Sequence, residues 1–164
     1  MSNYHIAELN VAKLKAPLDS PELKDFVDNL DRINALAESS EGFAWRLKDE
    51  GNDATSIRPL GDDVIINLST WRDVASLKRF VYQSAHTPIM KRRREWFTRM
   101  ADAYMVMWWV KAGHQPTAAE AVAKLEYLRQ HGPSPEAFTF GDAFAAPDAA
   151  QPGERFSFKD ACPA

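Results

Sequence analysis

One histidine lies where an acid–base group or an iron ligand could act. His86 ends an apolar segment at 74–86 that has helical spacing, and this segment follows a buried-type strand at 64–71 whose last residue is Trp71. This order directs a titratable ring toward an interior rich in tryptophan. Imidazole titrates near neutrality, and its neutral nitrogen binds iron. We keep two interpretations of His86: an acid, base or ligand in a cleft between helix and sheet, or a ring that binds the carbonyl groups at its helix end.

Two asparagines are candidates for holding an oxygen atom of a substrate. Asn10 and Asn67 each lie in the middle of an expected strand, among apolar neighbours. A buried amide without a partner costs about 1–3 kcal/mol, so both side chains need hydrogen bonds. Either they bond across the strands, or they join His86 as the catalytic group of a small-molecule site.

Aromatic rings and one arginine are candidates for the walls of that site. The chain has five tryptophans, which either pack the core or line a pocket for a flat molecule. The basic run at 91–94 spreads around one helical turn, so it either faces solvent or lets Arg93 or Arg94 reach a carboxylate. The substrate-binding residues that we expect are Trp45, Trp71, Tyr82, Arg93, Trp96 and Trp108.

Composition excludes several classes of protein. A chain of 164 residues favours one domain, and its net charge of −3 argues against nucleic-acid binding. No glycine-rich phosphate loop, zinc-protease motif or CxxC pair is present. The single cysteine, Cys162, cannot form an internal disulfide, and we expect a cytoplasmic protein. The most apolar stretch, 104–110, is too short to cross a membrane, so we expect no membrane partner.

Periodicity predicts the elements that would position these residues. Apolar alternation and helical spacing indicate strands at 5–14, 43–47, 64–71 and 103–111 and helices at 21–38, 74–86, 88–100 and 117–131, with a short strand or arm at 137–140. Caps are expected from Asp19 or Ser20, from a Thr70–Asp73 box and from a Thr117–Glu120 box.

The predicted order is βαββαβ followed by αβ, which matches a ferredoxin-like α+β fold over residues 1–144. Residues 145–164 are expected to form an extended or disordered tail. Helices cover one face of such a sheet, and we expect a second copy to bury the other face. The sequence therefore predicts a homodimer through sheet-to-sheet packing, a dimeric α+β barrel.

Five segments together resemble the DUF3291 family over residues 4–140. They are residues 7–12, 42–47, 67–71, 92–97 and 108–114. The family is similar to the dimeric α+β barrel superfamily, which includes antibiotic-biosynthesis and haem-degrading monooxygenases. That similarity implies a pocket between helices and sheet in each protomer.

The haem-degrading group uses a first-strand asparagine and an Ala-His pair near the end of the second helix, which Asn10 and Ala85–His86 match. Its tryptophan, ten residues before the histidine, is Ser76 in this chain, and Trp71 is not equivalent.

Three functions follow as hypotheses. One is a monooxygenase-like enzyme that acts on an aromatic or polyketide-like molecule with O₂ and no cofactor, in which His86 is the base or acid and Asn10 and Asn67 hold a carbonyl or phenolate oxygen. The second binds haem through His86 as axial ligand. The third is a non-catalytic metabolite-binding or structural module. The sequence does not decide whether the protein is an enzyme.

Overall fold

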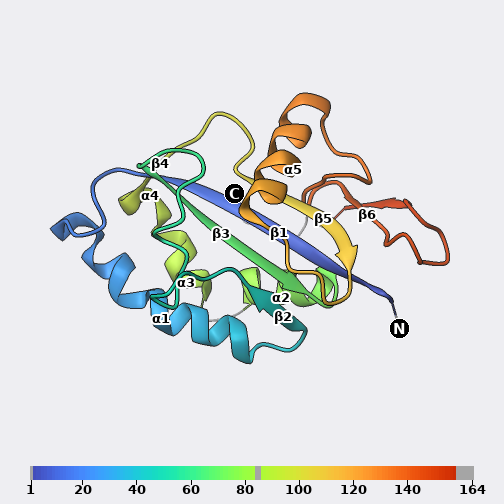
Figure 1. Cartoon of the computed structure of the whole chain (residues 1–164), viewed down its shortest axis with the longest axis horizontal. Helices are drawn as coiled ribbons and strands as arrows, with labels where there is room; N and C mark the ends of the chain where they lie inside the picture. The colour runs from blue at the N-terminus through green and yellow to red at the C-terminus, as the bar shows by residue number, and fades with distance from the viewer. Residues whose placement is uncertain (1, 84–85, 158–164) are drawn as a thin grey trace.

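A five-stranded antiparallel sheet organises the chain (Figure 1). The computed structural model describes residues 2–83 and 86–157, and the side chains of residues 86 and 87 also fall outside that description. The elements are β1 Tyr4–Leu14, η1 Pro21–Leu23, α1 Lys24–Ser39, β2 Phe43–Arg46, β3 Val64–Trp71, α2 Val74–Gln83, α3 His86–Lys91, α4 Arg93–Trp96, β4 Phe97–Thr98, β5 Met105–Lys111, α5 Ala118–His131, β6 Ala143–Phe144 and β7 Arg155–Phe156.

Strand order confirms the ferredoxin-like α+β fold. β2 pairs with β3, β3 with β1, and β1 with β5, and all of these pairings are antiparallel. The central strand is therefore β1, as a βαββαβ chain requires. In its register with β3, Asn10 lies directly opposite Asn67.

The central strand separates two interiors, because its side chains alternate between the faces of the sheet. The alternate residues Ile6, Glu8 and Asn10 face α1, α2 and α3. Leu9 and Val11 face the opposite side and belong to a core cluster with α5. Glu8 and Asn10 thus lie on the face beneath α1, α2 and α3, which also carries the cavity described below.

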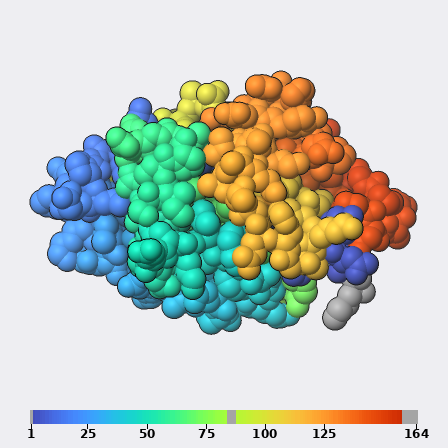
Figure 2. Space-filling model, viewed as in Figure 1, coloured from blue at the N-terminus to red at the C-terminus, as the bar shows by residue number. Residues whose placement is uncertain are grey.

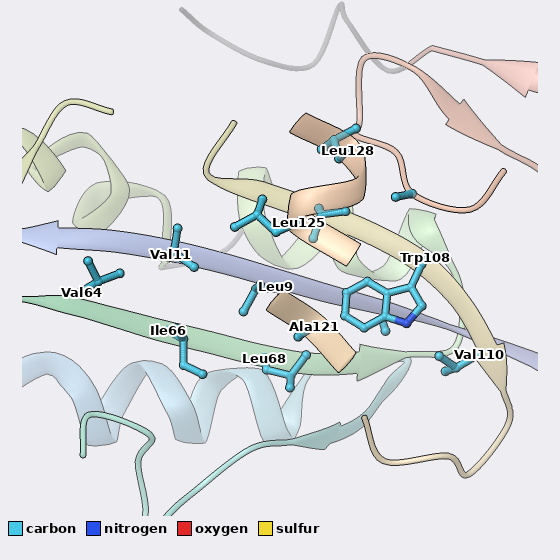
Figure 3. Packing of buried hydrophobic residues seen from close by; sticks show 13 residues of the cluster. Leu9, Val11, Val64, Ile66, Leu68, Trp108, Val110, Ala121, Leu125 and Leu128 are labelled. Atoms are coloured by element: carbon cyan, nitrogen blue, oxygen red, sulfur yellow. The ribbon is translucent and has the colours of Figure 1, made fainter. Parts of the chain in front are cut away.

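Helix α5 covers the other face of the sheet. Its apolar residues Ala121, Leu125 and Leu128 are at most 5% exposed and pack against the sheet (Figure 3). The same core cluster is completed by partly buried residues of the segment between β2 and β3, Ile57 and Leu60. Figure 2 shows the sheet largely hidden beneath α5 (orange) and this segment (teal to green). The homodimer stays a prediction, but the face expected to meet a second copy is buried within the chain itself.

The helix caps agree only in part with the sequence patterns. Thr117 caps α5, and its hydroxyl accepts a hydrogen bond from the Glu120 amide. At α2 the cap is Asp73 and not Thr70: the Asp73 carboxylate accepts a hydrogen bond from the Ser76 amide at 2.7 Å, and Thr70 is buried within β3. At the first helix, the chain begins with the 3-10 turn η1, and Ser20 makes no side-chain cap bond.

The helix predicted over 88–100 is shorter than expected. It is divided into α3 and α4, and the chain then enters β4, where Phe97 pairs with Leu14. The backbone amide of Lys15 also donates to the Trp96 carbonyl at 2.9 Å. Pairing with the end of β1, together with burial of Trp96 and Phe97, ends the helix early.

The C-terminal segment packs along the sheet. Phe138 exchanges two backbone hydrogen bonds with Met107 of β5, at the place where a short strand or arm was expected. Beyond it, β6 pairs with β7. The Asp148 carboxylate accepts hydrogen bonds from the Ser2 hydroxyl and the Asn3 amide, so this part of the expected tail contacts the N-terminus.

Candidate functional site

A cavity lies between the sheet and the helices α1, α2 and α3. It consists of two adjoining hollows, each partly open to solvent. The two hollows share lining residues, so we treat them as one site. The shared residues are Asn10, Ile33, Asn34, Arg46, Asn67, Met90 and Arg93.

Two amides lie side by side on the sheet floor of this cavity. Asn10 donates from Nδ2 to Glu8 Oε1 at 2.9 Å and to Oε2 at 3.3 Å. Asn67 lies opposite Asn10 and is exposed, and within the described part of the chain its side chain makes no hydrogen bond. The pair therefore has one amide that fixes a carboxyl group and one that is available to a ligand.

Glu8 is a buried carboxyl group that the sequence analysis missed. It is 6% exposed and lines the cavity, where burial raises its pKa to about 7 against the opposing effect of the Asn10 hydrogen bond. No ion pair to Glu8 occurs among the residues that the structure describes. A carboxyl group with this pKa exchanges a proton near neutral pH. Strand alternation could have found it, because Glu8 and Asn10 are two residues apart and share a face.

Aromatic side chains form the walls. Trp71 donates from its indole nitrogen to the Ser69 hydroxyl at 2.9 Å and stacks on Phe80 with ring centroids 5.1 Å apart. At the other end of the cavity, the Trp96 ring packs on the Phe26 ring with centroids 5.5 Å apart. These contacts fix large apolar surfaces around the polar floor, an arrangement typical of small-molecule sites.

Two arginines line the cavity with different partners. Arg46 is 9% exposed, and it donates from Nε to Glu38 at 2.7 Å and also to the Asn52 side chain. Arg93 is half-buried, and no carboxylate within the described residues lies in ion-pair distance of it. Its guanidinium instead lies 4.6 Å from the centroid of the Tyr104 ring.

Asn34 of α1 is a second residue that the sequence analysis missed. It is 9% exposed, lines both hollows and makes no side-chain hydrogen bond among the described residues. Its position one residue after Ile33, within the apolar stripe of α1, was the available signal.

The structure brings most of the predicted site residues together, but not all of them. Trp108 is buried beneath α5 and donates to Glu120 at 3.2 Å, and Trp45 packs on the same face of the sheet. Neither ring reaches the cavity, because strand alternation directs both away from α1, α2 and α3. His86 begins α3, and its side chain lies outside the described part. The predicted residues that line the cavity are Asn10, Asn67, Trp71, Tyr82, Arg93 and Trp96.

Among the residues that the structure describes, no group of three or more His, Cys, Asp or Glu is placed to hold a metal ion. Within the same ranges, no helix combines the length and the apolar character that a membrane span needs.

Sequence comparison identifies the family. Residues 5–155 match the model of the domain of unknown function DUF3291. The chain belongs to this family. The resemblance seen in the sequence is therefore confirmed for DUF3291 over nearly the whole chain. No curated protein matches the chain.

Solved structures with a similar fold share little sequence with this DUF3291 chain. A mutant of SnoaB, described as a cofactor-independent oxygenase from Streptomyces nogalater, is 14% identical with a TM-score of 0.44, covering 70% of this chain and 97% of its own. NE2512 from Nitrosomonas europaea, described as a protein of unknown function, is 13% identical with a TM-score of 0.44, covering 71% and 98%. PA3566 from Pseudomonas aeruginosa is 14% identical with a TM-score of 0.44, covering 70% and 98%. Likeness at this level assigns no activity to the chain.

Proposed function

We propose that the cavity between the sheet and helices α1, α2 and α3 binds a small organic molecule with a flat, largely apolar body. The observation that carries this proposal is the polar floor of Glu8, Asn10 and Asn67 between aromatic walls. Apolar walls supply binding energy, and a few convergent polar groups fix the orientation of a ligand. Asn67 and Asn34 offer amides that have no other partner among the described residues.

We propose further that the bound molecule is oxidised by O₂, with Glu8 as the general base. A base works best when its pKa lies near the working pH, and burial brings the pKa of Glu8 to about 7. Glu8 removes a proton from an acidic CH₂ group of the substrate, and an amide holds the adjacent carbonyl oxygen. The carbanion gives electrons to O₂, the C–O bond forms, and the hydroperoxide loses water. One CH₂ group and one O₂ become one carbonyl group and one water, so the substrate supplies all four electrons.

An anthrone tests both parts of this proposal, because it is a flat aromatic ketone with an acidic CH₂ group. Binding is measured by quenching of the tryptophan fluorescence of the chain, to which Trp71 and Trp96 of the cavity wall contribute. Oxidation is measured with an oxygen electrode against the rate without protein. We expect Glu8→Gln to bind the anthrone but to lower O₂ uptake by about 10²–10⁴-fold.

The matched control for this test is Glu126→Gln, an exposed glutamate on α5 away from the cavity. It should leave both binding and O₂ uptake unchanged. Binding without any O₂ uptake by the natural chain would contradict the oxidative assignment. Failure to bind would contradict the whole proposal.

The proposal assigns the base differently from the sequence analysis, which gave this role to His86. The imidazole remains a second candidate base and the candidate axial ligand of a haem. A haemin titration tests the haem alternative: a Soret band that forms with the natural chain and is lost in His86→Ala would support it. A band that survives in His86→Ala would remove His86 as the ligand.

A further inference from the structure

We infer that the ligand of this cavity carries a carboxylate and that Arg93 binds it. The inference rests on the proposed function, since it names the class of molecule that the same cavity accepts. It starts from one comparison between arginines in the same short region of the chain.

Arg92 and Arg93 are neighbours with opposite surroundings. The Arg92 guanidinium is paired with two carboxylates, because it donates to Asp25 at 2.9 Å and to both carboxylate oxygens of Glu95. Arg93 has no carboxylate partner among the described residues, although it is half-buried and lines both hollows. A partly buried cation without a counter-ion is stabilised by an anion that binds to it.

Two aromatic rings hold the Arg93 guanidinium in place. It lies 4.6 Å from the Tyr104 ring centroid and 5.9 Å from that of Phe97. Such cation–π contacts orient the planar group without neutralising its charge. Its fork of N–H donors stays available for two parallel hydrogen bonds, which a carboxylate accepts with matching geometry.

The other ionisable groups of the lining leave Arg93 as the cation without a paired carboxylate among the described residues. Arg46 brings a second positive charge, although Glu38 partly neutralises it. Among the described lining residues, Asp53 is the one carboxylate besides Glu8, and it accepts hydrogen bonds from the Thr55 amide and hydroxyl. Glu8 itself has no ion-pair partner among the described residues. Arg93 is therefore the cation that a ligand can approach, and the apolar walls beside it select a carboxylate with an aromatic or aliphatic body.

The test compares a carboxylate with its neutral amide. Naphthalene-2-carboxylate and naphthalene-2-carboxamide have nearly the same shape, and the same pair of derivatives of benzene and anthracene covers smaller and larger bodies. Binding to the full chain is measured by isothermal titration calorimetry at about pH 6, where the free carboxylate is ionised. We expect the carboxylate to bind about tenfold or more tightly than the amide.

Arg93→Gln should remove this preference while the carboxamide binds as before. Arg94→Gln is the matched control, because Arg94 is adjacent, exposed and outside the cavity lining. It should keep the preference. Circular dichroism spectra verify that both variants fold.

Each other outcome overturns a defined part of the argument. Equal binding of carboxylate and carboxamide by the natural chain, or a preference that survives in Arg93→Gln, would overturn the role of Arg93. A preference lost equally in Arg94→Gln would assign it to net charge and would also overturn that role. If no member of the panel binds the natural chain, the proposed cavity function fails, a result distinct from the others.

Discussion

At the scale of single residues, Glu8 differs from every other acidic side chain that the cavity contains. Asp53 accepts two hydrogen bonds within its own loop, from the Thr55 amide and the Thr55 hydroxyl. Glu8 has one donor, Asn10, and is otherwise surrounded by the sheet and by the apolar side chains of α1 and α2. A carboxyl group in this situation is stable as the neutral acid and costs free energy when it ionises.

This cost predicts a dependence of stability on pH. Because the pKa of Glu8 is about 7 in the folded chain against 4.5 as the ordinary value, its contribution is fully present below pH 4.5 and is lost as pH rises through 7. The loss amounts to at most ~3 kcal/mol for this shift from 4.5 to about 7. Glu8→Gln should therefore gain stability relative to the natural chain as pH rises, as measured by urea unfolding across this range. A stability difference that does not change with pH would contradict the burial of an ionisable carboxyl group.

The two floor asparagines give a matched pair of substitutions. The hydrogen bond from Asn10 lowers the pKa of Glu8, so Asn10→Leu should raise that pKa further. Asn67→Leu, directly across the sheet, should leave it nearly unchanged. An NMR titration of the Glu8 carboxyl carbon measures both values. Equal pKa shifts in the two variants would show that the hydrogen bond from Asn10 does not lower the pKa of Glu8.

At the scale of elements, α5 is the helix whose packing has the clearest energetic consequence. Leu125 is 1% exposed and lies in the core cluster with Leu9 and Leu68 (Figure 3). Leu125→Ala should lower the free energy of unfolding by about 2–5 kcal/mol through lost burial and the cavity left behind. Glu126→Gln, the next residue on the exposed side, should change it by less than about 0.5 kcal/mol. Urea unfolding measures both, and a small effect at Leu125 would mean that α5 does not stabilise the sheet.

The sequence predicts these elements well where one pattern acts alone. The alternation in β1, the stripe of α1 and the Thr117 cap of α5 each appear in the structure at nearly the expected positions. The prediction failed over 88–100, where helical spacing competed with a long-range pairing. Phe97 pairs in the sheet with Leu14, eighty-three residues earlier along the chain. Local periodicity carries no information on that partner.

The same limit applies to the site. Asn10 and Asn67 were predicted because an amide among apolar strand residues is conspicuous. Glu8 was missed because an acidic residue in a strand resembles the solvent-facing half of an alternating pattern. Trp45 and Trp108 were assigned to the pocket by residue type alone, whereas the face that each ring occupies depends on register.

At the scale of the whole molecule, the cover of the sheet determines how two copies can meet. A sheet-to-sheet homodimer requires the face that α5 buries. We therefore expect the backbone amides of Leu125 and Leu128 to stay protected from hydrogen exchange over a wide range of protein concentration, whatever mass light scattering reports. Protection that falls as a dimer forms would show that a second sheet displaces α5 and would restore the arrangement predicted from the sequence.

The central strand has a further consequence for which changes the molecule can tolerate. β1, eleven residues long, separates an apolar core under α5 from a solvent-open cavity under the other helices. Deleting a single residue near its start would exchange the two sets of side chains, moving Glu8 into the apolar core and Leu9 into the cavity. Insertions and deletions in this strand should therefore be far less tolerated than any single replacement, and length, more than side-chain identity, is the property that selection must preserve there.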